Sequence, residues 1–197
     1  MEIKSIKHNA IMNGILSVVQ VIFPLITFPY TSRVLGVEAN GRLTFATSVV
    51  SYFTLFATLG MTTYGIKACA RTRDDKVALS KTVHTLLLIS LVTTGVMFVA
   101  LIVALVLIPR LWTESALIAI NSLSLLLNVA GMNWLYSGIE QYDYITRRSI
   151  AFKILSLVLM FALVHSPEDI YIYAGITVFA TVGPNILNII NSRHYVN

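Results

Sequence analysis

The stretch TVHTLLLISLVTTGVMFVALIVALVLIP, residues 82–109, contains no Asp, Glu, Lys or Arg. A helix of about 20 apolar residues crosses the roughly 30 Å hydrocarbon core of a bilayer, so this run is long enough to span a membrane. Backbone N–H and C=O groups in lipid must find partners within the chain, which favours a helix over every other conformation. The stretch therefore predicts a membrane-spanning helix.

The same pattern recurs along the whole chain. Residues 8–32, 43–66, 115–139 and 170–192 are also free of charged side chains, and the apolar run 149–167 is interrupted only by Lys153. We therefore predict six spans, at residues 8–32, 43–66, 82–109, 115–139, 147–167 and 170–192. The short connections leave no room for a soluble domain, so residues 1–197 are expected to form one all-α transmembrane unit.

The composition supports a membrane protein. Of the 197 residues, 56% are hydrophobic and 12% are charged, and the mean hydropathy is +0.78. Soluble domains carry about 25% charged residues, so this chain could not cover a water-facing surface. A soluble enzyme and a nucleic-acid-binding protein are both disfavoured, despite the net charge of +5.

The basic residues predict the orientation of the spans. With a cytoplasmic N-terminus, the cytoplasmic segments are 1–7, 67–81, 140–148 and 193–197. Eleven basic residues then belong to the inner side, namely Lys4, Lys7, Lys67, Arg71, Arg73, Lys76, Lys81, Arg147, Arg148, Lys153 and Arg193. Three lie outside, at Arg33, Arg42 and Arg110. Because basic residues favour the inner side, we expect a multi-pass protein of the cytoplasmic membrane with both termini in the cytoplasm. The excess charge also attracts anionic membrane lipids.

Polar side chains form stripes along four of the predicted spans. In the first span, polar residues and one proline follow each other at steps of three or four residues, which places them on one face of a helix. They are Asn9, Asn13, Ser17, Gln20, Pro24, Thr27 and Thr31. The other stripes are Thr47, Ser51, Thr54, Thr58 and Thr62, then Asn121, Ser124 and Asn128, then Thr177, Thr181, Asn185 and Asn188.

Two interpretations of these stripes remain open. Small and hydroxyl side chains join packed membrane helices, often for only ~0.6 kcal/mol per hydrogen bond. Alternatively, the stripes line a watery cavity shared by several helices. Long amides favour the cavity, because each must satisfy several hydrogen-bonding atoms, and Pro24, Pro29 and Pro184 favour bent spans of the kind found in transporters. The candidate amides are Asn13, Gln20, Asn121, Asn185 and Asn188.

The charged residues allow similar alternatives. Lys153 either snorkels to the headgroups or marks a substrate path, because a charge at depth costs about 2.5–3.5 kcal/mol. Arg33 and Arg42 flank the predicted first outer loop, as interfacial anchors or as the rim of a cationic vestibule. Glu140 and Asp143 are expected in a solvated loop. Neither phosphate-loop motifs nor metal-ligand spacing occurs, so no catalytic residue, metal or cofactor is expected.

Three stretches carry more specific information than composition. They are PLITFPYTSRVLG at 24–36, which runs into NGRLTFA at 40–46, LFATLGMTTYGIKACARTRDDK at 55–76, and NWLYSGIEQYDYITRRSI at 133–150. Together they resemble the N-terminal half of bacterial polysaccharide flippases, which translocate O-antigen and capsule repeat units. That family belongs to the multidrug/oligosaccharidyl-lipid/polysaccharide exporter superfamily.

The resemblance implies a fold, a substrate and a set of site residues. Such proteins move polyprenyl-diphosphate-linked oligosaccharides between leaflets by alternating access between two helical lobes, without hydrolysing ATP, through a cavity that is typically cationic. Polysaccharide polymerases and glycosyltransferases are further candidate partners. The implied substrate-path residues are Asn13, Gln20, Arg33, Arg42, Lys153 and Asn185, and the polar stripes add Asn121 as a further candidate. The implied cytoplasmic entrance consists of Lys67, Arg71, Arg147 and Arg148.

The chain departs from this family in its length. Family members usually have two six-helix lobes, whereas six spans make one lobe. The sequence leaves open a fragment without activity, a half-transporter that pairs with a second copy, or one that pairs with a missing second lobe. An ion-coupled small-molecule exporter is an alternative function, disfavoured because no Asp or Glu lies inside a predicted span. A membrane-embedded glycosyltransferase is disfavoured because the acidic residues are divided between the two sides.

Overall fold

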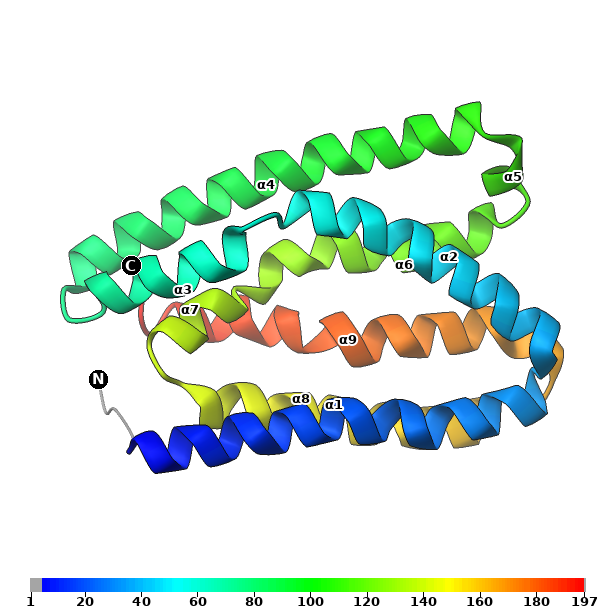
Figure 1. The fold of residues 1–197 in the computed structure, drawn as a ribbon, viewed down its shortest axis with the longest axis horizontal. Coiled ribbons are helices and arrows are strands. Elements are labelled where there is room, and N and C mark those ends of the chain that lie inside the picture. Colours follow the sequence, from blue (N-terminus) through cyan, green and yellow to red (C-terminus); the bar gives the residue numbers. More distant parts are fainter. Residues whose placement is uncertain (1–4, 197) are drawn as a thin grey trace.

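The computed structural model describes residues 5–196 as helices joined by short connections (Figure 1), so Lys4 lies outside the described residues. The prediction of an all-α fold is confirmed for this range. The elements are α1 (Ile6–Val34), α2 (Gly36–Ala57), α3 (Met61–Thr72), α4 (Lys76–Leu107), α5 (Pro109–Trp112), α6 (Ser115–Asn128), η1 (Val129–Gly131), α7 (Asn133–Gly138), α8 (Tyr142–Leu163), η2 (Pro167–Asp169) and α9 (Ile170–Ser192).

Most of the long helices in the bundle are long and apolar enough to cross a membrane. Four helical segments meet this criterion, and a fifth does if α2 and α3 are counted as one bent span. Its most apolar member is α4, with a mean hydropathy of 2.7 over its best window. The remaining long helix, α8, carries Arg147 and Arg148 in its first half and Lys153 near its middle. The described chain therefore contains four to five candidate spans where six were predicted.

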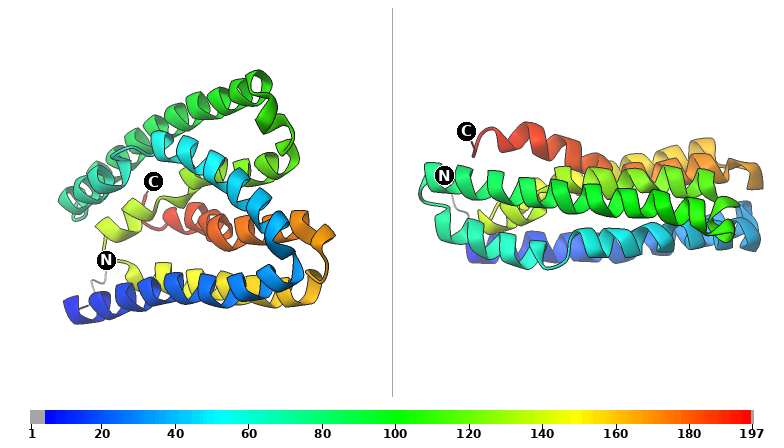
Figure 2. Two further views of the ribbon diagram at one scale, coloured as in Figure 1. Left: turned by 45° about the vertical axis from the view of Figure 1, so that its right-hand side comes forward. Right: turned by 90° about the horizontal axis from the view of Figure 1, so that it is seen from above.

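The helices pack side by side in a sequence that differs from their order in the chain. The pair α1–α8 lies on one side of the bundle and α4 on the other, with α9, α6 and α2 between them (Figures 1 and 2). The described chain begins and finishes at the same end of the bundle, which we call the terminal end. The α1–α2 and α8–α9 connections lie at the opposite end, which we call the far end.

Two predicted spans are broken, which corrects their boundaries. The run 43–66 divides into α2 and α3, which meet at an angle of 43°. Gly60 has a φ of 72° directly before α3, a left-handed conformation that glycine adopts without steric cost. The run 115–139 divides into α6, η1 and α7, with Met132 at a φ of 40°. Neither break lies at a proline, because Pro24, Pro29 and Pro184 all lie inside continuous helices.

The predicted outer loop between residues 33 and 42 is also corrected. It is almost entirely helical, because α1 ends at Val34 and α2 begins at Gly36. Gly36 has a φ of 81°, which reverses the chain direction within a single residue. Arg42 therefore lies inside α2 and not in a loop.

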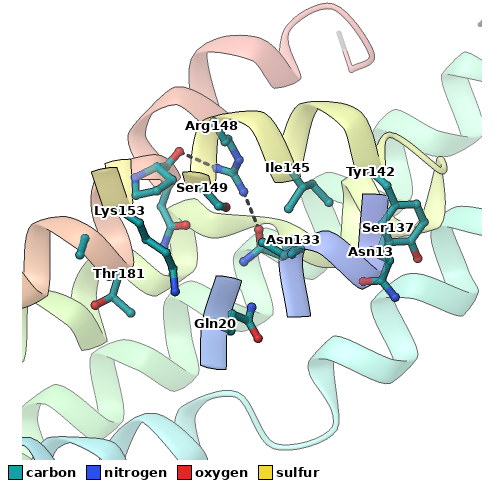
Figure 3. A pocket seen from close by; sticks show the side chains of 14 residues that line it. Asn13, Gln20, Asn133, Ser137, Tyr142, Ile145, Arg148, Ser149, Lys153 and Thr181 are labelled. Carbon is teal, nitrogen blue, oxygen red and sulfur yellow. Dashed lines mark hydrogen bonds between the residues drawn. The ribbon is translucent and has the colours of Figure 1, made fainter. Parts of the chain in front are cut away.

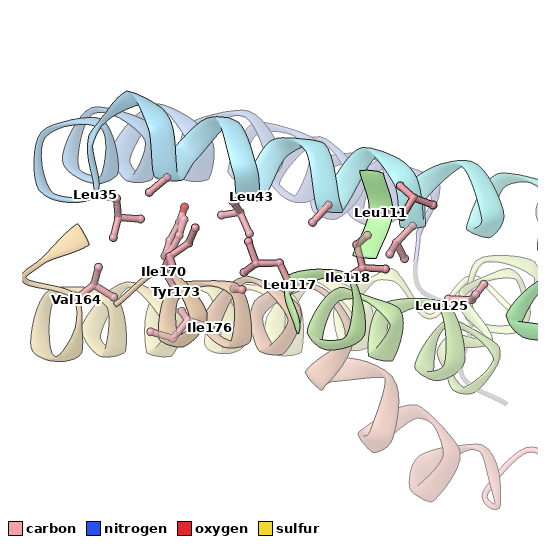
Figure 4. Close-up of a cluster of buried hydrophobic side chains, with 14 of the residues drawn as sticks. Leu35, Leu43, Leu111, Leu117, Ile118, Leu125, Val164, Ile170, Tyr173 and Ile176 are labelled. Carbon is pink, nitrogen blue, oxygen red and sulfur yellow. The ribbon is translucent and has the colours of Figure 1, made fainter. Parts of the chain in front are cut away.

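The buried apolar side chains form two separate clusters. The larger one, shown in Figure 4, joins α2, α6, α8 and α9 to the second half of α4 and includes Leu117, Ile118 and Leu125. The smaller one joins α3 and α7 to the first half of α4 and includes Leu135 and Ile139. The breaks in the two spans separate these clusters. We call the regions around them the far half and the terminal half.

Candidate functional site

The terminal half contains a polar cavity between α1, α7, α8 and α9. Its volume is about 400 Å³. It brings together four of the substrate-path candidates and one entrance candidate, which come from three helices far apart in sequence (Figure 3). Its lining residues include Asn13, Gln20, Asn133, Ser137, Tyr142, Arg148, Ser149, Lys153, Thr181 and Asn185. We call it the basic cavity, because Arg148 and Lys153 are its charged residues.

Arg148 is held in a defined position in the wall of this cavity. Only 7% of the residue is exposed. Its Nη1 donates to the carbonyl of Pro184 at 2.6 Å, and its Nη2 donates to Oδ1 of Asn133 at 2.8 Å. The guanidinium carbon lies 5.9 Å and 5.5 Å from the ring centres of Tyr136 and Tyr144, within range for cation–π attraction.

One hydrogen-bond donor of Arg148 is unused within the described chain. Its Nε is buried and has no hydrogen-bond partner there. A buried donor without a partner is costly, and the cost rises when the group is charged. Arg148 was predicted as an entrance residue, whereas the structure places it in the cavity wall.

Lys153 lines the same cavity farther along α8. Its side chain is half-buried, and its Nζ lies 4.9 Å from the ring centre of Phe23 on α1. The ammonium group is thus attracted to the face of a half-buried aromatic ring. This contact joins α8 to α1 beside the polar stripe of α1.

The three amides predicted for the substrate path that line the basic cavity differ in how strongly the fold already uses them. Asn185 donates from Nδ2 to the carbonyl of Leu127 at 3.1 Å, so part of its hydrogen-bonding capacity stabilises the end of α6. Asn13 and Gln20 are exposed on the face of α1 that borders the cavity. Those two side chains are therefore better placed to bind a ligand than Asn185.

The stripes of α2, α6 and α9 converge on a second cavity, which has a volume of about 510 Å³. It is lined mainly by hydroxyl and amide side chains and contains no charged residue. The hydroxyl and amide residues that line this cavity are Thr47, Ser51, Thr54, Thr58, Asn121, Ser124, Asn128, Thr177 and Thr181. We call this second cavity the hydroxyl cavity. Thr181 also lines the basic cavity, so the two cavities are neighbours.

Asn121 faces the hydroxyl cavity and not the basic cavity. Its Nδ2 donates to the carbonyl of Leu117 at 2.8 Å, and its Oδ1 accepts from Thr47 at 3.2 Å. A third cavity, of about 710 Å³, shares Thr47 and Ser51 with the hydroxyl cavity and continues along the α1 stripe past Thr27. It also contains Phe23, Phe28, Tyr52 and Tyr173, and we call it the aromatic cavity.

The two substrate-path arginines, Arg33 and Arg42, do not line any of these three cavities. Arg42 donates from Nε to Oε1 of Glu114 at 2.7 Å, an ion pair between α2 and the start of α6. Arg33 is exposed in the last turn of α1. The structure thus separates both residues from the basic cavity.

Ion pairs join helices at the terminal end. Arg73, directly after α3, donates to Glu140 at 2.6 Å, and Asn9 of α1 donates to the same carboxylate at 3.4 Å. His8 contacts Asp143, which also lies 3.5 Å from the guanidinium of Arg147. Of the two acids expected in a solvated loop, Glu140 lies in the connection between α7 and α8 with its side chain 33% exposed. The expectation was wrong for Asp143, which is buried in α8, and both carboxylates contact side chains of α1.

The remaining entrance candidates lie on the surface of the terminal end. Lys67 and Arg71 are exposed on α3. The side chain of Arg147 is 77% exposed. These residues lie on the same end as the ion pairs but do not line the basic cavity.

Sequence reasoning missed the residues that hold Arg148. Asn133, Tyr136 and Tyr144 were recognised only as part of the motif at 133–150. Phe23, which contacts Lys153, was not predicted as a site residue. The useful signal was the aromatic and amide content of that motif, directly before the Arg147–Arg148 pair. Among the described residues, no group of three or more His, Cys, Asp and Glu side chains could hold a metal ion.

Comparison with known proteins identifies a family and a distant relative. The family model described as "Polysaccharide biosynthesis protein" matches residues 6–196. A protein of Escherichia coli (strain K12) named "Putative O-antigen transporter" is 24% identical over 168 residues. That match covers 85% of this chain and 40% of the relative, so the chain spans less than half the length of this curated relative. No solved structure gives a significant match.

The family match extends over almost the whole described chain, including the motif that builds the wall of the basic cavity. The chain therefore belongs to the polysaccharide biosynthesis protein family of membrane proteins.

Proposed function

We propose that this chain forms one lobe of a transporter that moves a polyprenyl-diphosphate-linked oligosaccharide across the cytoplasmic membrane. The observation that carries the proposal is the basic cavity, in which a buried arginine and a lysine face a polar space inside an apolar bundle. Ionised groups at such depth are costly and generally mark a functional path. The family membership and the name of the Escherichia coli relative support a saccharide substrate.

In this proposal the chain crosses the membrane six times with both termini in the cytoplasm. Four or five spans meet the criteria of length and hydropathy, and α8 supplies the sixth. Its three basic residues do not prevent this, because Arg148 is buried, Lys153 lies over Phe23, and Arg147 lies near the helix start. An even number of crossings agrees with the two described ends lying at one end of the bundle.

Arg148 and Lys153 would bind the anionic part of the substrate. A guanidinium group is planar, always charged and suited to phosphate oxygens. The unpartnered Nε of Arg148 would gain an acceptor when an anion enters. Asn13, Gln20 and Ser137 would contact sugar hydroxyls from the opposite wall. A volume of about 400 Å³ can hold a diphosphate and a sugar, but not an entire repeat unit.

The polar stripe of α1 would be covered by a partner. In the most apolar window of α1, only 6% of the residues are buried within the chain, and Asn13, Ser17 and Gln20 are exposed. Polar side chains are unfavourable against lipid, so a second lobe or a second copy of the chain would complete the pathway on this face.

The test is genetic complementation in a strain whose surface polysaccharide depends on this gene. Deletion should abolish surface polysaccharide, and the wild-type gene should restore it. Arg148→Ala should restore less than a tenth of it at equal membrane abundance, because no other described side chain replaces the buried guanidinium. Arg148→Lys should restore an intermediate level, because the charge remains but the bonds to Asn133 and Pro184 are altered.

The matched control is Arg193→Ala, which removes an exposed arginine after α9 and should leave the level unchanged. Full restoration by Arg148→Ala would show that the basic cavity is not the anion site. Unchanged surface polysaccharide after deletion would contradict the transport function itself.

A further inference from the structure

The two broken spans lie next to each other and divide the bundle at one level. A cavity of about 160 Å³ separates the ends of α2 and α6 from the starts of α3 and α7. It is lined by polar side chains from five helices and connections, among them Thr58, Thr62, Ser90, Thr94, Asn128 and Asn133. Backbone interruptions at membrane depth occur where the chain is buried in protein or lines a cavity, and they are common in the moving helices of transporters.

The far side of each break is firmly fastened to an unbroken helix. Thr93 of α4 donates to the carbonyl of Ala57, the last residue of α2, at 2.9 Å. Asn188 of α9 donates to the carbonyl of Gly131, at the end of η1. These bonds satisfy carbonyl groups that the breaks release from helical pairing. The helices α2 and α6 are thereby fixed to α4 and α9.

Beyond the breaks, α3 and α7 are locked to each other. A Cβ atom on Gly65 of α3 would lie 2.8 Å from Cγ of Trp134. A Cβ atom on Gly138 of α7 would lie 2.7 Å from Cβ of Cys69. Each helix thus packs a side chain directly against a glycine of the other. The ion pair between Arg73 and Glu140 joins the segments that follow the two helices. Such close packing on both sides favours movement of the two helices as one body.

The residues at the breaks can act as hinges. Met132 has a φ of 40°, which is strained for a residue with a side chain, and Gly60 has a φ of 72°. Hinge movements are absorbed by a few residues at the ends of elements. Leu135 and Ile139 pack against the first half of α4. Two hydrogen bonds set the position of α7 relative to α8 and α9, namely Asn133 to Arg148 at 2.8 Å and Tyr136 to the carbonyl of Asn188 at 2.7 Å.

We propose that α3 and α7 form a single hinged unit that turns about the two breaks. In the observed position it is latched by Asn133 and Tyr136, and Asn133 acts as a positioning residue for Arg148. When the unit turns, Asn133 leaves Arg148 and the wall of the basic cavity opens toward the terminal end. The consequence for transport depends on the proposed function, but the movement itself does not.

The test measures distances in the full chain, in lipid nanodiscs, by double electron–electron resonance. In a Cys69→Ala background, one spin-label pair joins the unit to the fixed half, at Lys67→Cys and Val99→Cys. The control pair joins two fixed helices, at Phe56→Cys and Val99→Cys. The three labelling positions, of which Val99 belongs to both pairs, are exposed side chains on α2, α3 and α4.

Tyr136→Phe keeps the ring but removes one latch, and Asn133→Ala removes the other. Each should add a second population to the Lys67–Val99 distances while the Phe56–Val99 distances stay unchanged. Asn133→Asp keeps an acceptor for Arg148 and should restore the single population. Identical distributions in all variants would overturn the proposal, as would equal changes in both label pairs.

Inorganic pyrophosphate serves as the probe for the link to the basic cavity. It should shift the Lys67–Val99 populations in the wild-type background and have no effect in Arg148→Ala. A response to Tyr136→Phe without any response to pyrophosphate would support the hinge and count against the proposed anion site. The two claims can therefore fail separately.

Discussion

The far half and the terminal half of the bundle are built in different ways from the same kind of sequence. In the far half, α2 and α6 pack with α9 around one large apolar cluster, and the hydroxyl cavity beside it has no charged lining residue. In the terminal half, α3 and α7 are short, the apolar cluster is small, a buried arginine lines the basic cavity, and ion pairs join helices at the terminal end.

This contrast indicates that the far half is rigid and that the terminal half can change its conformation. Apolar packing gives the far half a single stable arrangement, because interiors are close-packed and resist deformation. The terminal half depends on a few directional contacts that can be exchanged for others, such as the bond between Asn133 and Arg148. Regions with few buried apolar contacts open at low free-energy cost. The two halves should therefore respond independently to substitution.

The largest effect is expected from truncating a core leucine in each half. Leu125→Ala in the far half and Leu135→Ala in the terminal half each remove a fully buried side chain. Each should lower the free energy of unfolding by about 2–5 kcal/mol, measured by SDS-induced unfolding in mixed micelles. Hydrogen exchange should then accelerate in α3 and α7 for Leu135→Ala, without acceleration in α2 and α6.

Leu125→Ala provides the opposite arm of this comparison. It should accelerate exchange in α2 and α6, and the terminal half should follow because it is fastened to the far half. Acceleration of all helices by both variants would show that the two halves form one cooperative unit.

Filling the glycine contact between α3 and α7 should have the next largest effect. Gly138→Val places a branched side chain at a position where a Cβ atom alone would lie 2.7 Å from Cβ of Cys69 and 2.9 Å from the carbonyl oxygen of Ile66. Overpacking of this kind costs about 1–3 kcal/mol, which the same unfolding measurement can detect.

The control is Gly95→Ala in α4, where nothing lies within 4 Å of the added Cβ atom. Alanine favours a helix over glycine by about 0.8–1.0 kcal/mol, so this variant should be neutral or more stable. Equal behaviour of the two variants would contradict the close contact of α3 with α7.

Removing the amide that caps the break in the fourth predicted span should cost somewhat less. Asn188→Ala leaves the carbonyl of Gly131 without the side-chain donor that now satisfies it, and Asn188 is completely buried. We expect a loss of about 1–3 kcal/mol, the usual cost of an unsatisfied buried group. Asn191→Ala, which removes a longer bond of 3.4 Å to Tyr136, should cost less than half as much.

The smallest effect is expected from the hydroxyl that caps the other break. Thr93→Val keeps the shape of the side chain but removes the donor to the carbonyl of Ala57. Side-chain hydrogen bonds between membrane helices average about 0.6 kcal/mol, so the loss should be of that size. Thr85→Val removes a bond within α4 alone and should be neutral. A larger effect of Thr85→Val would reverse the assignment.

Hydropathy and periodicity predicted the helices and their polar faces well, because both are local properties of the sequence. The stripe of the first predicted span lines the basic and aromatic cavities, and those of the second, fourth and sixth meet in the hydroxyl cavity. These positions follow from the helical period alone. Whether the cavities carry water and substrate stays a prediction.

Other features depend on contacts between distant segments and could not be predicted in this way. The break at Met132 has no glycine or proline at that position, and its carbonyl groups are satisfied by α9, more than 50 residues away. Arg42 looks like a free cation in the sequence until Glu114 is placed beside it. Arg148 and Arg147 are adjacent, yet only the packing of Tyr136 and Tyr144 distinguishes the buried residue from the exposed one.

The central claim is that the polar stripe of α1 borders a water-filled pathway, and cysteine accessibility in native membranes tests it most directly. In a Cys69→Ala background, Gln20→Cys lies on the stripe, whereas Val21→Cys lies on the next position, where the side chain is 63% exposed on an apolar face. We predict rapid reaction of Gln20→Cys with a membrane-impermeant thiol reagent and no reaction of Val21→Cys. Equal reactivity at the two positions, or inertness of Gln20→Cys alone, would contradict the account.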